Sequence, residues 1–382
     1  MQLHGKKLTE EFTPLALNGI QKLWVKEGHA RQTINRWTLA IKQMFNWGVT
    51  YGYVSTNTHY KLSQVPNLKE GHTAAPEYDE VKPVDPEVVA RTIPFMPPVI
   101  ADMVRVQLLG GFRAQDVRNM RICDIDRREK IWRYTPFEHK TKHKGKLRLL
   151  AVGPRAQKIL TTYLIQKQDK PTVFLFSPRD SVEIQREEKR RNRKTKVQPS
   201  QINRKKENPK RQPAEQYTKE SYARAVARAC RKAGTQATIT GLTKDTKYEF
   251  RHRALLDDGS SNWSESVFVV TNREETFNTR KLTFKNISKT TDSATFTWPY
   301  VKEASYEVQY RPVGETTWTT VSIEKFPEWS PGQLRHTAGS AIRDKYGLDG
   351  AQVCLAHASA KTSEIYAVLN FEKAARIMAD MG

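Results

Sequence analysis

The spacing of the apolar residues changes twice along this chain, and this limits the folds that it can adopt. Residues 8–62 and much of 86–234 have apolar side chains roughly every three to four positions, as amphipathic helices do. Residues 235–325 instead form short segments, rich in Thr, Val, Tyr and Trp, in which polar and apolar residues alternate. The helical pattern returns over residues 326–382. The sequence therefore predicts an all-β module inside a mainly helical chain.

Strand-like segments in the inserted block predict a β-sandwich. They are short, and turn residues separate them, which is typical of two packed antiparallel sheets. In chain order they are ATITGL, KYEFRHRAL, ESVFVVT, KLTFKNI, SATFTW, SYEVQYR and WTTVSI.

The N-terminal segment, residues 1–65, is predicted to be a helical domain with one apolar stripe. Arg31, Arg36 and Lys42 lie off that stripe, where they suit phosphate contact and an ordinary solvated surface equally well. Residues 66–85 are rich in Pro, Gly and charge, and are expected to form a linker. The stripe consists of Ile34, Trp37, Ile41, Phe45 and Gly48.

A larger α+β domain is predicted in two parts, residues 86–234 and 326–382. Its first part has a buried helix, 99–110, that ends at Gly110 and Gly111. A hairpin follows, with IWRYTP and KLRLLAV as its strands. The predicted fold class is multidomain: a mainly α N-terminal domain, an α+β domain, and an all-β sandwich inserted between the two parts of the latter.

The charge of the chain favours a polyanionic partner. It has 64 Lys and Arg against 41 Asp and Glu, a net charge of +23, and nucleic acid is the commonest partner for such a surplus. The sequence has no apolar run of about 18 residues that could span a membrane, and its N-terminus lacks the apolar stretch of a signal peptide. The three cysteines lie far apart, which argues against disulfides and a zinc site. We expect a cytoplasmic, nucleoid-associated protein.

Residues 186–211, the basic segment, contain 12 Lys or Arg and 3 Glu. Such a composition cannot form a core, so we predict a flexible loop or arm that lies along DNA. A solvated linker is the alternative. The candidate DNA contacts within it are Arg190, Arg191, Arg193 and Lys194.

Short motifs in the helical parts of the chain resemble the signature of one enzyme family. In chain order they are GGFRAQDV, EHKTKHKGKLR, QLRHTAGSAI, LAHAS and TSEIY. They resemble the motifs of tyrosine recombinases, or phage integrases, and the sequence around them is similar to a bacterial branch of that family. The resemblance covers about residues 10–233 and 326–382. It implies a site-specific enzyme that cleaves and rejoins DNA through a 3′-phosphotyrosyl intermediate.

The resemblance assigns the nucleophile and the proton-transfer groups. Tyr366 would attack the phosphorus, with nearby cations helping its hydroxyl to ionise. Lys140, on the hairpin turn, would protonate the leaving 5′ oxygen. His357 would hydrogen-bond the phosphate or accept the tyrosine proton. Taken alone, a tyrosine or histidine at these positions is more often part of a core, and it is the joint spacing that favours the catalytic interpretation.

The resemblance also assigns the groups that neutralise the phosphate. Arg113 and Arg335 would each donate two hydrogen bonds to phosphate oxygens and stabilise the pentavalent transition state. Asp116 would support this site, and it would suit an ordinary ion pair with Arg113 equally well. Lys142 and Lys144, beside the catalytic lysine, would contact the DNA backbone.

The implied partner is double-stranded DNA, on which the protein would self-associate as a dimer or tetramer. The phosphotyrosyl bond conserves the energy of the phosphodiester, so rejoining needs no ATP, and we expect no metal and no cofactor. Gly332 departs from the family pattern, which has His three residues before the second arginine. That departure leaves a second function open, a DNA-binding recombinase scaffold with weakened catalysis.

The inserted block, residues 235–325, resembles a fibronectin type III domain whose halves are in reverse order. Leu242, Thr246 and Tyr248 are spaced as in the tyrosine corner of that family, which belongs late in the domain. Trp298 resembles its early core tryptophan, yet it comes later in this chain. A single circularly permuted domain, grafted into a loop, accounts for this order. The chain would then be a chimera, natural or engineered, whose sandwich binds a ligand that the sequence does not identify.

Overall fold

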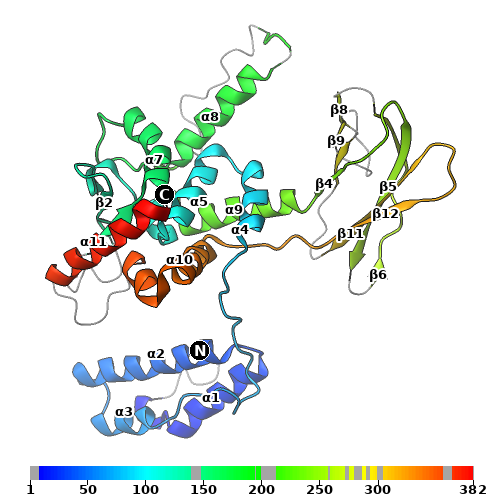
Figure 1. Cartoon of the computed structure of the whole chain (residues 1–382). Coiled ribbons are helices and arrows are strands. Elements are labelled where there is room, and N and C mark those ends of the chain that lie inside the picture. The colour runs from blue at the N-terminus through cyan, green and yellow to red at the C-terminus, as the bar shows by residue number, and fades with distance from the viewer. Residues whose placement is uncertain are drawn as a thin grey trace. The chain divides into compact units, whose positions relative to one another are not determined.

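The computed structural model describes residues 8–138, 148–193, 195–198, 212–256, 259–271, 275–278, 286–289, 293–298, 304–355 and 364–381. The chain divides into two compact units, Met1–Val81 and Lys82–Gly382 (Figure 1). It is therefore multidomain, as predicted, and the division falls within the predicted linker, residues 66–85. Nowhere in these ranges is a helix both long enough and apolar enough to span a membrane.

From Leu8 on, where its description begins, the N-terminal unit has three helices, α1 (Pro14–Lys26), α2 (Arg31–Thr50) and α3 (Thr56–Ser63), after a short 3₁₀ turn at Thr9–Glu11. Hydroxyl groups fix two helix starts: Thr13 accepts from the N–H of Ala16 at 3.3 Å, and Ser55 accepts from the N–H of Thr58 at 3.1 Å. The predicted stripe on α2 is confirmed. Ile34, Phe45 and Gly48 are buried, whereas Trp37 and Ile41 are half-buried. The core that they face includes Leu17 and Leu62.

The second unit contains a helical body with one small antiparallel sheet. Its first part runs through α4 (Pro86–Thr92), a 3₁₀ turn (Ile93–Phe95), α5 (Pro98–Gly110), α6 (Ala114–Arg118), a 3₁₀ turn (Ile122–Asp124), β1 (Ile125–Asp126), β2 (Trp132–Tyr134), β3 (Leu150–Val152), α7 (Pro154–Gln166), α8 (Pro178–Arg191) and α9 (Lys219–Ala233). After the inserted block it ends in α10 (Pro331–Cys354), which is kinked at Gly347, and α11 (Glu364–Met381). Helix α5 is buried along most of its length and packs against α7, α8 and α10.

The predicted hairpin is confirmed as the antiparallel pair of β2 and β3, in which Trp132 pairs with Val152. Its turn, with Lys140, Lys142 and Lys144, lies outside the described residues. The prediction for the basic segment was partly wrong, because residues 186–191 continue α8. That helix is capped by the Ser177 hydroxyl, which accepts from the N–H of Asp180 at 3.1 Å. In Figure 1 its far end projects from the body. Lys194 and residues 199–211 lie outside the described residues.

The inserted block forms two antiparallel sheets, and Figure 1 shows the chain entering it from α9 and leaving it toward α10. The strands are β4 (Gln236–Ile239), β5 (Lys247–Leu256), β6 (Gly259–Ser260), β7 (Val267–Val270), β8 (Glu275–Asn278), β9 (Asn286–Lys289), β10 (Ala294–Thr297), β11 (Ser305–Pro312) and β12 (Thr319–Ile323). One sheet has the order β4-β10-β9-β8, and the other has the order β12-β11-β5-β6 with β7 also paired to β5.

Both sheets contribute to one core. Ile239, Phe296 and Trp298 come from the first sheet and its flank, and Phe250 and Val308 come from the second. Each predicted segment contains a strand within the described residues, although KLTFKNI is described only at its end. The segment NREETFNTR, interpreted from the sequence as a connection, contains an additional strand, β8, which pairs with β9. The Tyr248 hydroxyl accepts from the N–H of Thr243 at 3.0 Å, a contact of the kind expected for a tyrosine corner.

His252 makes the stability of this module depend on pH. It is 8% exposed, and its ring centroid lies 5.8 Å from that of Trp298. Burial lowers the pKa of His252 from 6.5 to about 4. As the pH falls from 6.5 to 4, the unfolded chain takes up a proton that the folded module resists, so the contribution present above pH 6.5 is lost. We expect the free energy of unfolding to fall by about 3 kcal/mol over this window.

Urea series equilibrated at pH 7 and near pH 4.5 would measure this loss, with unfolding read by hydrogen-exchange mass spectrometry on peptides of β5 and β10. His252→Phe should remove most of the difference between the two midpoints. His72→Phe, at an exposed position of the N-terminal unit, serves as the control. An equal acid shift in His252→Phe would assign the loss to other groups.

Candidate active site

The turn between α5 and α6 positions Arg113. Gly111 ends α5 with φ of 60°, a left-handed conformation that glycine adopts without strain. A Cβ atom at Gly111 would lie 2.6 Å from Cδ2 of Leu355, so any other residue there would also displace the end of that side chain. Arg113 follows as the residue that precedes α6, and its side chain is exposed.

The start of α10 positions Arg335. Buried contacts hold this end of the helix: Nε2 of Gln107 donates to the carbonyl of Pro331 at 2.5 Å, and the Thr337 hydroxyl donates to the carbonyl of Val84 at 2.8 Å. Nη1 of Arg335 donates to the carbonyl of Gly111 at 2.8 Å, and Nη2 donates to the carbonyl of Leu355. Arg335 is thus tied to the turn that carries Arg113. A guanidinium has five N–H groups, so three remain for a ligand.

A buried ion pair lies beside these two arginines. Nη1 and Nη2 of Arg148 donate to the two carboxylate oxygens of Asp116 at 2.8 and 2.9 Å. One of these oxygens also accepts from the backbone N–H of Arg113 at 2.8 Å. The alternative in which Asp116 pairs with the side chain of Arg113 was therefore wrong: Asp116 holds the Arg113 backbone, and its ion-pair partner is Arg148.

Arg113, Arg148, Arg335 and Asp116 form what we call the arginine cluster. Burial and then the charges of Arg113 and Arg148 lower the pKa of Arg335 to about 9. Partial desolvation and the charge of Arg148 also lower the pKa of Arg113, although solvent still reaches its side chain. A pKa of about 9 still leaves Arg335 charged at neutral pH. Three cations with one anion leave an excess of positive charge, which favours an anionic ligand.

No family model, curated protein or solved structure matches this chain. The chemistry of the cluster therefore rests on its own geometry and on the residues around it.

The structure brings some of the predicted catalytic residues together and leaves the others untested. Arg113, Asp116 and Arg335 converge, as described above. Tyr366 lies in the first turn of α11, where its backbone is described and its side chain is not. Helix α11 packs on its own unit through Ala374, Ile377 and Met378, which join a core with Ile342 of α10. His357 and Lys140 lie outside the described residues.

Gly332 is exposed in the first turn of α10, three positions before Arg335. A Cβ atom built there would meet only the hydroxyl of Ser330, at 3.7 Å. The position therefore has room for a side chain on the helix face that also carries Arg335.

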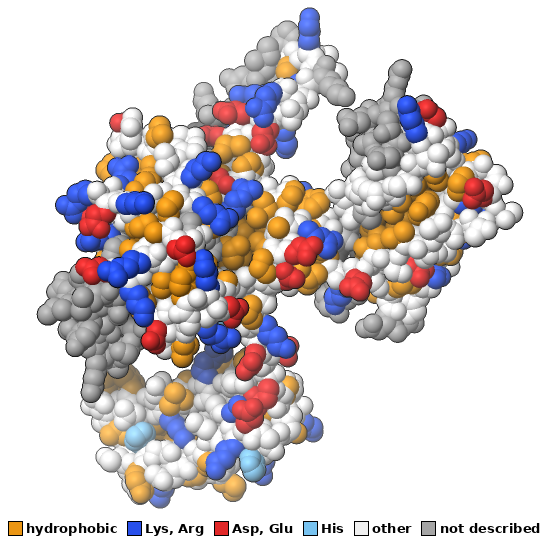
Figure 2. All heavy atoms as spheres, viewed as in Figure 1, with side chains coloured by type: hydrophobic (Ala, Val, Ile, Leu, Met, Phe, Trp, Pro, Cys, Tyr) orange, Lys and Arg blue, Asp and Glu red, His pale blue; other side chains and the backbone are white. Residues whose placement is uncertain are grey.

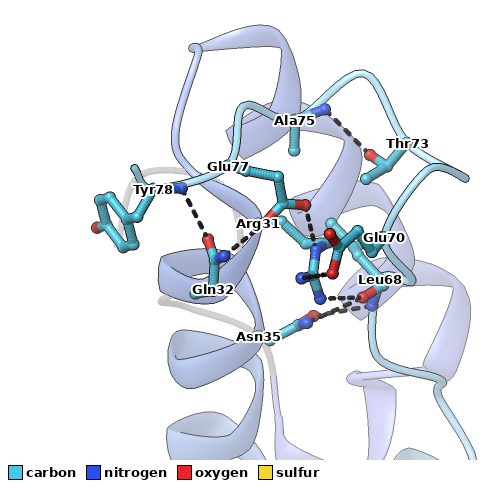
Figure 3. A network of polar contacts seen from close by, with 9 residues as sticks. All are labelled: Arg31, Gln32, Asn35, Leu68, Glu70, Thr73, Ala75, Glu77 and Tyr78. Carbon is cyan, nitrogen blue, oxygen red and sulfur yellow. Dashed lines mark hydrogen bonds and ion pairs between the residues drawn. The ribbon is translucent and has the colours of Figure 1, made fainter. Parts of the chain in front are cut away.

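Two of the predicted DNA contacts in the N-terminal unit have intramolecular partners. Figure 3 shows Arg31 bound by the segment that follows α3: its guanidinium pairs with Glu70 at 3.3 Å and with Glu77, and it donates to the carbonyl of Leu68 at 3.3 Å. The Glu77 hydrogen bond raises the pKa of Arg31. Part of the predicted linker is thus attached to α2, where Asn35 exchanges two further hydrogen bonds with Leu68.

Lys42 donates to the carbonyls of Ser63 at 3.2 Å and Val65 at 2.5 Å. Its ammonium group therefore holds the chain where α3 ends. Arg31 and Lys42 thus have partners within the chain, and their contact with DNA stays a prediction. Arg36 is exposed on α2 and is available to a ligand.

Of the remaining candidate DNA contacts, Arg190 and Arg191 end α8 and Arg193 follows it. Arg190, Arg191 and Arg193 are exposed, whereas Lys142, Lys144 and Lys194 lie outside the described residues. On the face that Figure 2 shows, Lys and Arg side chains are spread among acidic and apolar ones rather than gathered in a single patch.

Sequence reasoning missed Arg148. The residue follows Leu147 and precedes Leu149 and Leu150, and an arginine inside such an apolar run is a signal of a buried, paired charge. Its partner could not be predicted, because Asp116 is 32 residues away in the sequence.

Proposed function

We propose that this protein is a site-specific tyrosine recombinase that cleaves and rejoins double-stranded DNA through a 3′-phosphotyrosyl intermediate. The observation that carries the proposal is the arginine cluster, in which two arginines from distant motifs meet around a fixed turn. Its excess of positive charge suits a phosphodiester. The motif order in the sequence supports the same reaction.

In the proposed reaction, the hydroxyl oxygen of Tyr366 attacks the phosphorus and forms a phosphotyrosyl ester. The bond to the 5′ oxygen breaks, and that oxygen takes a proton from Lys140, while the tyrosine proton passes to His357 or to solvent. Arg113 and Arg335 stabilise the charge that develops on the non-bridging oxygens. Rejoining is the reverse reaction, with a 5′ hydroxyl as the nucleophile. Each step conserves the number of phosphoester bonds.

DNA binding in this proposal rests on the net charge of +23, on Arg36 and on the exposed arginines at the end of α8. Self-association as a dimer or tetramer on DNA would bring two cleavage sites together. The inserted block would be a circularly permuted fibronectin type III module. The order of its sheets and the Tyr248 contact support that interpretation.

A second candidate function is a DNA-binding scaffold of the same fold with slow catalysis. It is favoured by Gly332, which leaves open space where a proton-relaying or phosphate-binding side chain is expected. The two functions differ in one measurable product, the covalent protein–DNA adduct.

The test of this proposal uses a nicked duplex whose sequence is selected by binding from a random library. Cleavage beside the nick releases a short strand, so an active enzyme stays covalently trapped. We expect the unmodified protein to form the adduct and Tyr366→Phe to form none, with DNA affinity unchanged within about threefold because phosphate contacts dominate it. Adduct formation by Tyr366→Phe would exclude Tyr366 as the nucleophile, and absence of adduct from both proteins would favour the scaffold.

A further inference from the structure

The Arg148–Asp116 pair is among the most buried polar contacts in the described part of the chain. The side chain of Arg148 is 6% exposed and that of Asp116 is 2% exposed. Asp116 is fixed at its backbone as well, because its carbonyl accepts from the hydroxyl of Tyr134 at 2.8 Å. Tyr134 is itself fully buried. Asp116 is therefore held at both its carboxylate and its backbone, in the first turn of α6.

Stability alone is a weak explanation for this pair. Removing two charges from water costs about as much as their attraction returns, and apolar residues of similar size often serve a core equally well. The pair also lies next to Arg113, whose pKa Arg148 lowers and Asp116 raises. A position between a catalytic arginine and the core suggests that the pair controls that arginine.

Competition between Arg148 and Arg113 for the Asp116 carboxylate explains how the pair would control Arg113. The carboxylate of Asp116 accepts from the backbone N–H of Arg113. It therefore lies at the base of the side chain that carries the Arg113 guanidinium. A buried carboxylate without a partner would attract the nearest guanidinium strongly. Arg148 prevents this, because its two terminal nitrogens occupy both carboxylate oxygens.

We propose that Arg148 is a positioning residue, which keeps the Arg113 guanidinium free for a phosphate by satisfying Asp116. The inference rests on the proposed function for the identity of that phosphate as a DNA phosphodiester. Its physical content, the competition between Asp116 and a phosphate for Arg113, can be tested without DNA.

The experiment measures two quantities for a set of variants: the affinity for inorganic phosphate, by titration calorimetry, and the single-turnover rate of adduct formation on the nicked duplex. Arg148→Lys keeps the charge but offers one nitrogen, which cannot occupy both oxygens. Arg148→Met removes the charge. The double variant Arg148→Met, Asp116→Asn removes the competition and has the same net charge as the unmodified cluster.

We expect Arg148→Lys to lower both quantities about tenfold and Arg148→Met to lower the rate about 10²-fold, the loss typical of one misplaced donor. The double variant should recover at least about tenfold over Arg148→Met, because Arg113 is released again. Arg121→Met is the matched control. Arg121 forms a similar two-point pair with Asp124, at 2.7 and 2.8 Å, and should leave phosphate affinity unchanged.

Each result distinguishes a positioning role of Arg148 from a purely structural one. An Arg148→Lys variant with unmodified affinity and rate would overturn the proposal, since charge alone would then suffice. A double variant no better than Arg148→Met would also overturn it, because a structural role predicts that losing both partners gives no recovery. Phosphate affinities that follow the expected order, in a protein that forms no adduct, would support the positioning role and reject the recombinase function.

Discussion

Replacing Arg335 with lysine is expected to lower single-turnover cleavage by about 10²-fold or more, with little change in DNA affinity. The guanidinium does two things at once. Two of its nitrogens hold the carbonyls of Gly111 and Leu355, and in the proposed reaction its remaining N–H groups would donate to the phosphate. A lysine ammonium offers three donors at one nitrogen, so it cannot hold the turn and form a two-point contact with a phosphate.

The control for this variant is Arg105→Lys. Arg105 makes an ion pair with Asp102 on α5 at 2.8 Å, and its side chain is 45% exposed. This substitution should leave the rate unchanged, which separates a general loss of arginine from a loss at the site. A cleavage rate of Arg335→Lys within about threefold of the unmodified protein would show that Arg335 makes no two-point contact in the transition state.

Gly332→His is expected to raise the cleavage rate at least tenfold and up to about 10²-fold, the contribution of one preorganised donor. The position is exposed, and a Cβ atom would meet only Ser330, so histidine fits without displacing the core. It lies one turn before Arg335, on the same helix face. His336 cannot serve instead, because adjacent helical residues diverge by about 100° around the axis.

Single-turnover cleavage of the nicked duplex by the two proteins, at saturating protein concentration, measures this gain. Gly19→His is the matched control, since Gly19 is also helical and a Cβ atom there would meet nothing within 4 Å. It should leave the rate unchanged. Equal rates for Gly332→His and an active unmodified protein would mean that another residue supplies the missing group.

Local pattern predicted the elements of this fold better than their partners. The stripe from Ile34 to Gly48 and the alternation in residues 247–255 each reflect one buried face, so the residues themselves carry the signal. Strand β8 was missed because its four residues form a strand by pairing with β9, and that pairing is not visible in the local sequence. The last turn of α8 was predicted as part of a flexible arm because it is basic and exposed, and a helix can continue without burial once it has begun.

In the candidate site, too, some residues could be predicted from the sequence and their partners could not. Arg113 and Arg335 were predicted from motif resemblance. The intramolecular partners of Arg31 and Lys42 were not, because a basic residue on a helix surface looks the same in the sequence whether a phosphate or an oxygen of the chain itself binds it. Arg31 meets Glu77 across 46 residues, and Lys42 meets Val65 across 23. Such long-range pairs depend on the packed fold and leave no local periodicity.

The central claim, covalent catalysis by Tyr366, is tested most directly by locating the residue that carries the DNA. The unmodified protein is trapped on the selected nicked duplex and digested with nuclease and protease, and the nucleotide-bearing peptide is sequenced by mass spectrometry. We expect a single modified peptide, with a 3′-phosphonucleotide on the hydroxyl of Tyr366 in α11. A nucleotide on any other residue, or attachment through a 5′ phosphate, would contradict the account.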